Sequence, residues 1–323
     1  MHLDLIIIGG GPIGMVCGIE AKKAGLESLI LEKGTLVNSL YHFPANMSFF
    51  STSLLLEIGD VPFISHADKP TRTEALEYYR RISTAWQLPI HLYETVKQIE
   101  KREAGFSVVS DKAAYTCDYV VVATGFYDQF IPLNIPGENL PKVKHYYDEA
   151  HPYYQQKLAV IGAGNSACDV ALECLQKGAQ VTLIVRSPQL KESIKYWIRP
   201  NIENRIKDQS IRAFFNTELV EIKENSIIIR QDGQLHELEN DFVLAMTGYR
   251  PDYNFLTSIG IRYDSDEFCT PLYNEETLES SLPGLYLAGV IIGGMKTNKW
   301  FIENTRDHGK KIVDHILLKK QNE

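Results

Sequence analysis

Three glycines near the start of the chain have the spacing that a dinucleotide-binding turn requires. Gly9, Gly11 and Gly14 follow an apolar run at residues 5–8 and open a helical pattern. The first glycine allows a sharp turn out of a strand, the second allows backbone N–H groups to approach a pyrophosphate, and the third allows close packing of the helix on the sheet. A second apolar run ends in Glu32, whose carboxylate can accept a hydrogen bond from a ribose 2′-hydroxyl. This stretch predicts a site for a dinucleotide with a free ribose.

The same pattern returns in the middle of the chain with a different charge at its end. A strand-like run at residues 158–161 enters Gly162-x-Gly164-x-x-Ala167, and the strand after the next helix ends in Arg186. An acid at this position would repel a 2′-phosphate, whereas an arginine can pair with it. The second unit therefore predicts an NADP(H) site, and the alternative for Arg186 is a solvated charge at a strand end.

These two repeated units predict an α/β fold with two Rossmann-like domains of three layers. Residues 88–122 alternate in four runs, HLYETVKQI, GFSVVS, AAYTC and DYVVVATG, which predict an antiparallel meander whose last strand returns to the main sheet. Residues 212–244 repeat such a meander. Thr71 and Glu74 form a capping box that starts a helix ending near residue 87, and a final helix is expected from about 299 to 318.

Composition excludes several classes of protein. The 323 residues carry a net charge of −8 and no basic run, which argues against nucleic-acid binding. The apolar stretches are short and glycine-rich, and the chain enters its first strand directly, so we expect a cytoplasmic protein without a membrane span or a signal peptide. Five scattered cysteines with no CxxC pair predict neither a metal site nor a thioredoxin-type redox pair.

The segment at residues 40–53, LYHFPANMSFFSTS, is too long for a hairpin turn and too aromatic for a disordered linker. A loop of this kind is suited to cover a flat ligand. The alternative is a small hydrophobic cluster beneath a long loop.

Together these features resemble the two-dinucleotide-binding flavoprotein reductases, in the short form typified by bacterial thioredoxin reductase. The likeness is greater to one branch, the bacillithiol disulfide reductase family, and it covers essentially the whole chain. The motifs that carry it are EKG at 32–34, Tyr41, Pro44, Phe49, Phe50 and Ser51 in the aromatic loop, IGDVPFI at 58–64, HYYDEAHPYY at 145–154, SIKYWIRPN at 193–201, AMTGYRPDY at 245–253, and AGV, FIEN and HG between 288 and 309.

The resemblance implies FAD in a discontinuous domain, residues 1–145 plus 248–323, and NADPH in residues 146–247. For FAD it implies contacts at Gly9, Gly11, Pro12, Ile13, Gly14, Glu32, Lys33, Tyr41, Phe50, Ser51, Thr124, Gly125, Gly289, Val290 and Asn304. For NADPH it implies contacts at Gly162, Gly164, Asn165, Ser166, Ala167, Arg186, Ser187, Lys191 and Gly248.

The chain departs from these families in three ways. It lacks the CxxC of thioredoxin reductases, it has Ile13 where the bacillithiol branch has a cysteine, and its second turn reads GAGNS where that branch usually has GGKNS. Cys17 lies one helical turn after Ile13 and is a candidate replacement for the missing thiol, although a small buried core residue is the favoured interpretation.

The resemblance implies hydride transfer from NADPH to FAD and electron transfer on to a low-molecular-weight thiol disulfide, such as bacillithiol disulfide. Electron transfer to a redox carrier protein, as in ferredoxin or flavodoxin reductases, needs no cysteine and is the first alternative. A flavin- or NADPH-binding sensor is the second. The expected partner is therefore a small disulfide or a carrier protein, with a homo-oligomer possible.

Overall fold

The computed structural model describes residues 2–322, which divide into two compact units. The first comprises residues up to Gln129 together with residues from Tyr249 onward, and the second is Phe130–Gly248. The chain enters the second unit at Phe130, earlier than the boundary at 146 drawn from the sequence. The reason is that β8 (Val143–Lys144) pairs in parallel with β15 (Phe242–Ala245) and so belongs to the second unit's sheet.

The first unit is built on a parallel sheet in which β1 lies in the centre. The parallel part has the order β3-β2-β1-β6, and β17 also pairs with β6. The same seven-stranded sheet continues from β6 through the antiparallel strands β5 (Phe106–Ser110) and β4 (Val96–Lys101). These strands are β1 (His2–Ile8), β2 (Ser28–Leu31), β3 (Ile90–His91), β6 (Ala114–Val122) and β17 (Leu285–Leu287). The carboxyl ends of five parallel strands therefore meet at one edge.

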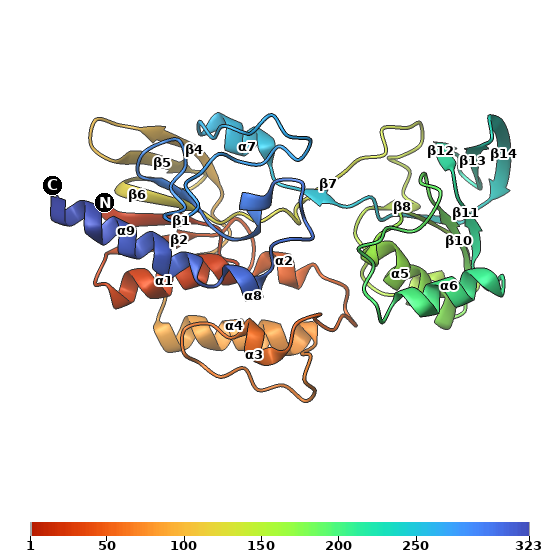
Figure 1. The fold of residues 1–323 in the computed structure, drawn as a ribbon, viewed down its shortest axis with the longest axis horizontal. Coiled ribbons are helices and arrows are strands. Elements are labelled where there is room, and N and C mark those ends of the chain that lie inside the picture. Colours follow the sequence, from red (N-terminus) through yellow and green to blue (C-terminus); the bar gives the residue numbers. More distant parts are fainter. Residues whose placement is uncertain (1, 323) are drawn as a thin grey trace. The chain divides into compact units, whose positions relative to one another are not determined.

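Helices cover one face of this sheet and a β-meander covers the other. On the helical face α1 (Pro12–Lys23) lies beside α9 (His308–Asn322), and α4 (Arg72–Trp86) packs in the same core cluster (Figure 1). On the other face, β4 (Val96–Lys101), β5 (Phe106–Ser110) and α7 (Tyr253–Ser258) share a core with β1. This gives three layers, as expected from the sequence.

The predicted start of α4 is confirmed, but one predicted strand and one predicted helix are each divided in two. Thr71 and Glu74 form the expected capping box. The single strand expected at HLYETVKQI is instead two strands, because β3 pairs with β2 and the chain bends at residues 92–95 before β4. The single final helix is instead α8 (Ile302–Thr305) and α9, and Arg306 between them donates to the backbone carbonyls of Leu54 and Glu57.

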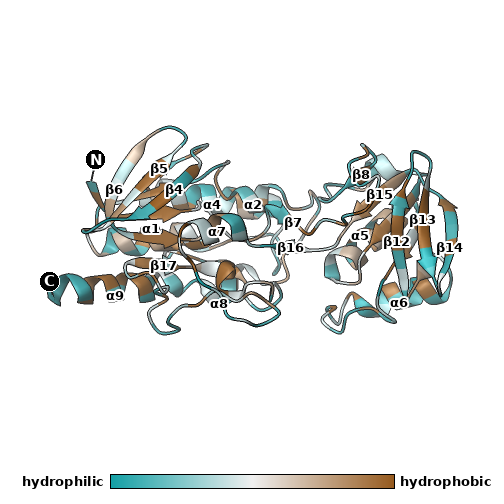
Figure 2. Ribbon diagram, turned by 90° about the horizontal axis from the view of Figure 1, so that it is seen from above, coloured by the Kyte–Doolittle hydropathy of each residue, from teal (hydrophilic) through white to brown (hydrophobic). Residues whose placement is uncertain are grey.

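The second unit repeats the parallel architecture on a smaller scale. Its sheet has the order β11-β10-β9-β15-β8, and a separate antiparallel meander follows the order β12-β13-β14. In Figure 2 the central strand of this meander, β13, is largely hydrophobic, whereas the edge strand β14 is largely polar. The elements are β9 (Lys157–Ile161), α5 (Asn165–Gln176), β10 (Gln180–Ile184), α6 (Arg199–Lys207), β11 (Arg212–Phe214), β12 (Thr217–Ile222), β13 (Ser226–Gln231) and β14 (Gln234–Glu239).

The remaining elements are short. They are α2 (Asn38–Tyr41), α3 (Ser53–Leu56), the 3-10 turns η1 (His151–Tyr153) and η2 (Gly289–Gly293), and the paired strands β7 (Gln129–Phe130) and β16 (Tyr249–Arg250). Within residues 2–322, no helix has both the length and the apolar character that a membrane span needs. The same residues contain no cluster of three or more histidine, cysteine or acidic side chains placed to hold a metal ion.

Candidate functional site

Three turns meet at the carboxyl edge of the first sheet, joined by backbone hydrogen bonds. The N–H of Gly9 donates to Leu31 at 2.8 Å, that of Ala123 donates to Ile8 at 2.8 Å, and that of Ala288 donates to Val122 at 2.9 Å. The first glycine turn (residues 9–14), the turn Ala123-Thr124-Gly125 (the ATG turn) and the turn Ala288-Gly289 (the AG turn) therefore lie side by side. Ligands of open parallel sheets bind at this edge.

In the first glycine turn, protein atoms crowd Gly9 and Gly14, whereas the space next to Gly11 is empty. At Gly9, φ is +110° and an added Cβ would lie 2.5 Å from the Ala123 oxygen, while a Cβ on Gly14 would lie 1.9 Å from the Gly9 oxygen. A Cβ on Gly11 would meet nothing within 4 Å. Pro12 and Ile13 begin α1 directly after this turn, so the open space lies at a helix N-terminus, where an anion is stabilised. This space suits a pyrophosphate.

Glu32 lies beside this turn with both carboxylate oxygens already in contact with backbone. It is 6% exposed, and it accepts hydrogen bonds from Gly10 N at 2.6 Å and Gly34 N at 2.8 Å. Burial raises the pKa of Glu32, and the two backbone hydrogen bonds oppose this shift. Each oxygen keeps acceptor capacity for a ribose hydroxyl.

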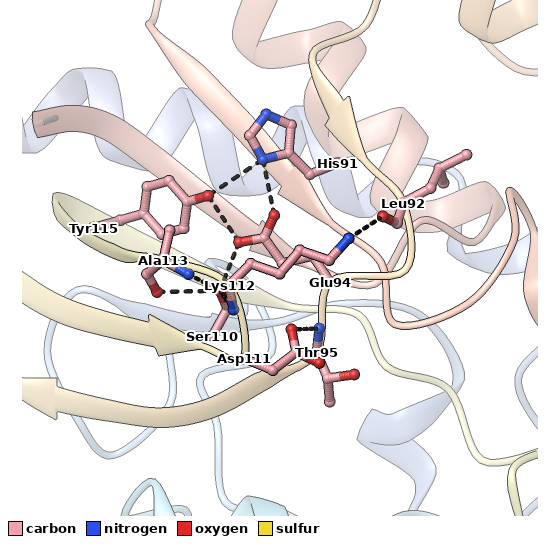
Figure 3. Close-up of polar contacts among 9 residues, drawn as sticks. All are labelled: His91, Leu92, Glu94, Thr95, Ser110, Asp111, Lys112, Ala113 and Tyr115. Carbon is pink, nitrogen blue, oxygen red and sulfur yellow. Dashed lines mark hydrogen bonds and ion pairs between the residues drawn. The ribbon is translucent and has the colours of Figure 1, made fainter.

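The loop beside Glu32 carries a polar cluster that could not be predicted from the sequence. Figure 3 shows the carboxylate of Glu94 among the side chains of His91, Ser110 and Tyr115. The main chain of this loop also bonds to Glu32 on both sides, because Glu32 N donates to His91 O and Glu94 N donates to Glu32 O.

The ATG turn offers an unpaired polar atom. Thr124 Oγ1 is buried and has no hydrogen-bond partner, and Gly125 has φ +68° with no atom within 4 Å of an added Cβ. Lys33, which is half exposed, forms an ion pair with Asp128 at 2.8 Å and so ties the end of β2 to the segment after this turn. An unpaired buried hydroxyl at an open edge fits a site for a polar ligand.

The AG turn packs against Ile13. An added Cβ on Gly289 would lie 3.3 Å from Ile13 Cβ, and partly buried Val290 follows in η2. Gly289 N donates to Nδ1 of His308 at 3.1 Å, and burial lowers the pKa of His308 to about 4, so its imidazole is neutral at pH 7. His308 belongs to the HG motif, but the sequence did not predict it as a site residue. Asn304, predicted to contact the flavin, is exposed, and its amide bonds to Phe301 N and Lys299 O.

The aromatic loop is partly core and partly surface. Phe49 is buried in the main cluster, Phe50 and Ser51 are half-buried, and Tyr41 is 51% exposed. Arg72, which the sequence did not single out, fixes the loop by donating from one guanidinium nitrogen to Tyr41 O at 2.7 Å and to Phe43 O at 3.0 Å. Phe49 therefore packs in a hydrophobic cluster, as the alternative interpretation expects, while the covering of a ligand by exposed Tyr41 stays a prediction.

The second glycine turn has the same form as the first. Gly162 has φ +145°, an added Cβ there would lie 2.5 Å from the Met246 oxygen, and the Ala167 Cβ packs beside it. A Cβ added at Gly164 would have Cδ of Lys191 as its nearest neighbour, at 3.9 Å. The backbone N–H of Lys191 donates to Ala163 O. The predicted Lys191 thus lies over the turn, with space left for a phosphate.

Arg186 lies two residues after the end of β10 at Ile184, and it is exposed. Arg199 was missed in the sequence: it donates to Lys191 O at 2.7 Å and so helps to hold the segment that crosses the turn. Asn165 holds the same segment through Ser193 O and Lys195 N, and Ser187 bonds locally to Gln189 O. Ser166 is exposed at the start of α5, and Gly248, with φ +103°, ends the unit.

Asp169 lies one turn into α5, and burial together with nearby Glu173 raises its pKa to about 6. A raised carboxyl pKa means that the folded state holds the proton more tightly, so this contribution to stability is complete at low pH and is lost as the pH rises toward 6. The Asp169→Asn protein should therefore gain stability over the wild type at pH 8 by about 1–2 kcal/mol, and much less at pH 4.5. Urea unfolding at both pH values measures this, and an equal difference at the two would contradict the assignment.

Comparison with known proteins agrees with this geometry. The family model for pyridine nucleotide-disulphide oxidoreductases matches residues 6–289. Bacilliredoxin reductase Bdr of Bacillus subtilis is 43% identical over 317 residues, 98% of each chain. The bacillithiol disulfide reductase of Staphylococcus aureus superposes with a TM-score of 0.96 at 42% identity over 99% of both chains. That of Bacillus cereus gives 0.97 at 40% identity over 99% of this chain and all of the other.

The sequence resemblance is therefore confirmed over nearly the full length, and with it the fold of two Rossmann-like domains. Members of this family are oxidoreductases that use a flavin and a pyridine nucleotide. The chain belongs to the pyridine nucleotide-disulphide oxidoreductase family.

Proposed function

We propose that this chain is an FAD-containing, NADPH-dependent oxidoreductase that reduces a low-molecular-weight thiol disulfide, with bacillithiol disulfide as the first candidate. The observation that carries the cofactor assignment is the contrast between the two turns. The first has a buried acid, Glu32, beside its open glycine, and the second has exposed Arg186 and Lys191. The likeness to two bacillithiol disulfide reductases supports the substrate class.

The residues of the chain would bind, orient and shield the FAD cofactor. Backbone N–H groups at the start of α1 would hold the FAD pyrophosphate and Glu32 the ribose, while Thr124 Oγ1 and the Gly289 turn lie at the neighbouring strand ends. When bound, FAD would supply the two-electron chemistry that couples NADPH oxidation to disulfide cleavage. The balanced reaction consumes NADPH, one proton and the disulfide, and yields NADP⁺ and two thiols.

The cysteines of this chain do not provide a thiol at the first turn. Ile13 occupies the position of the expected cysteine, and four of the five cysteines are buried, with Cys269 exposed. Cys17 has 0% exposure, and burial raises its pKa to about 12, so its thiolate is strongly disfavoured at neutral pH. We infer that electrons pass to the acceptor without a cysteine relay at this turn.

The Cys17→Ala enzyme should retain NADPH-dependent disulfide reduction. Loss of the buried sulfur should lower the free energy of unfolding by about 1 kcal/mol, with kcat and KM within about twofold of wild type. Steady-state kinetics at matched FAD content measures this. A loss of kcat greater than about tenfold would instead place the Cys17 thiol in the mechanism.

A second candidate acceptor is a redox carrier protein. Electron transfer to ferredoxin or flavodoxin needs no cysteine at residue 13. Separately, the Bacillus subtilis relative is named as the reductase of another carrier protein, bacilliredoxin. We propose a cytoplasmic location for either function, with a homo-oligomer possible.

An anaerobic acceptor screen separates these functions. NADPH oxidation should accelerate with bacillithiol disulfide alone if the small disulfide is the substrate. Acceleration only with oxidised bacilliredoxin, flavodoxin or ferredoxin would favour a carrier protein. If NADPH reduces the flavin and no acceptor accelerates reoxidation, the sensor function is favoured.

A further inference from the structure

Glu94, in the loop between β3 and β4 of the first unit, has an almost fully buried carboxylate. The residue is 4% exposed. One oxygen accepts hydrogen bonds from Ser110 Oγ at 2.6 Å and Tyr115 OH at 2.8 Å, and the other lies 3.0 Å from Nδ1 of His91 (Figure 3). A buried carboxylate requires such partners, since an unpaired one is strongly destabilising.

The donors belong to a hairpin that is itself rigidly closed. Ser110 ends β5 and Tyr115 lies in β6, and Ser110 Oγ accepts from the backbone N–H groups of Lys112 at 3.1 Å and Ala113 at 2.9 Å. Lys112 Nζ also reaches Leu92 O at 3.3 Å. Glu94 therefore joins the loop after β3 to a fixed part of the meander.

The other side of the same loop contacts Glu32. Glu32 N donates to His91 O at 2.9 Å, Glu94 N donates to Glu32 O at 2.8 Å, and Tyr93 N donates to Gly34 O at 3.1 Å. The backbone of Glu32 is thus held on both sides by the loop that Glu94 anchors. Its carboxylate in turn accepts from Gly10 N in the first glycine turn.

We propose that Glu94 is a positioning residue for the ribose site: by anchoring residues 91–94 to the hairpin, it fixes the Glu32 acceptor that selects an adenosine 2′-hydroxyl. This inference rests on the proposed binding of FAD at the first turn. A site of this kind depends on outer partners that hold the contacting group within a fraction of an ångström. Removal of the Glu94 carboxylate leaves the Tyr115 hydroxyl without the oxygen it donates to and leaves Ser110 Oγ only the Ala113 oxygen at 3.1 Å, so the loop loses its side-chain anchor.

The test compares binding of ADP and 2′-deoxy-ADP to the apoprotein by calorimetry. The wild type should prefer ADP by about tenfold or more, as expected for a hydroxyl bonded to a charged acceptor. Glu32→Ala should abolish the preference, and Glu94→Ala should reduce it to about two- to threefold. The double variant should show no further loss of preference beyond Glu32→Ala, because Glu94 acts through Glu32.

Two controls keep the test decisive. Glu103→Ala changes an exposed acid in the same meander and should leave the preference at the wild-type value. Tyr115→Phe removes one donor while keeping the ring, so it decides the question if Glu94→Ala fails to fold, with an intermediate preference expected. An unchanged preference in both Glu94→Ala and Tyr115→Phe would overturn the inference. Failure of the wild type to bind FAD or ADP would instead overturn the proposed function.

Discussion

The Gly11→Ala protein should lose FAD affinity while its apoprotein remains nearly as stable as wild type. An added Cβ at Gly11 meets no protein atom within 4 Å, and its φ of −72° suits alanine. The methyl group would instead enter the space where the pyrophosphate must approach the backbone. We expect a loss of at least tenfold in affinity, about 1.4 kcal/mol or more, against a change in apoprotein stability of less than about 1 kcal/mol.

Gly14→Ala provides the contrast, because the same small change there meets the protein itself. Its Cβ would lie 1.9 Å from the Gly9 oxygen, so α1 must move away from the turn. Apoprotein stability should fall by about 1–3 kcal/mol together with FAD affinity. Reconstitution of apoprotein with FAD, followed by flavin fluorescence, and urea unfolding measure the two effects. Wild-type FAD affinity in Gly11→Ala would show that this turn does not hold the pyrophosphate.

The Arg186→Ala enzyme should lose much of its preference for NADPH over NADH. Arg186 and Lys191 are both exposed, and a 2′-phosphate would accept charge-assisted hydrogen bonds from Arg186. The ratio of kcat/KM for the two coenzymes should fall by about 5- to 150-fold, or about 1–3 kcal/mol. Stopped-flow reduction of the bound flavin by each coenzyme measures this.

Arg230→Ala is the matched control, because Arg230 lies in β13 of the same unit and forms an exposed ion pair with Glu218. Its coenzyme ratio should equal that of the wild type. If Arg186→Ala also keeps the wild-type ratio, Arg186 is only a solvated charge and the second site does not read the 2′-phosphate through it.

Sequence reasoning found the two turns because their requirements are local. Gly9 and Gly162 have positive φ and backbone oxygens 2.5 Å from any added Cβ, so glycine is required at both places and the spacing remains visible in the sequence. The capping box of Thr71 and Glu74 is equally local, and the structure confirms it.

Contacts between distant segments could not be predicted in this way. The chain bends after β3 because His91 pairs with β2, although its alternating pattern continues into β4. The last helix is interrupted where Arg306 reaches carbonyls more than 240 residues earlier in the chain. Glu94 lies in an alternating sequence pattern that is typical of a strand. No residue next to it in the sequence indicates that Ser110 and Tyr115 contact its carboxylate.

The most direct measurement is anaerobic titration of the purified, FAD-containing protein with NADPH and, separately, with NADH. The proposed function predicts that about one equivalent of NADPH bleaches the flavin absorbance band, and that NADH acts much more slowly at the same concentration. Protein that binds no flavin from FAD-supplemented solution, or bound flavin that NADPH does not bleach, would contradict it.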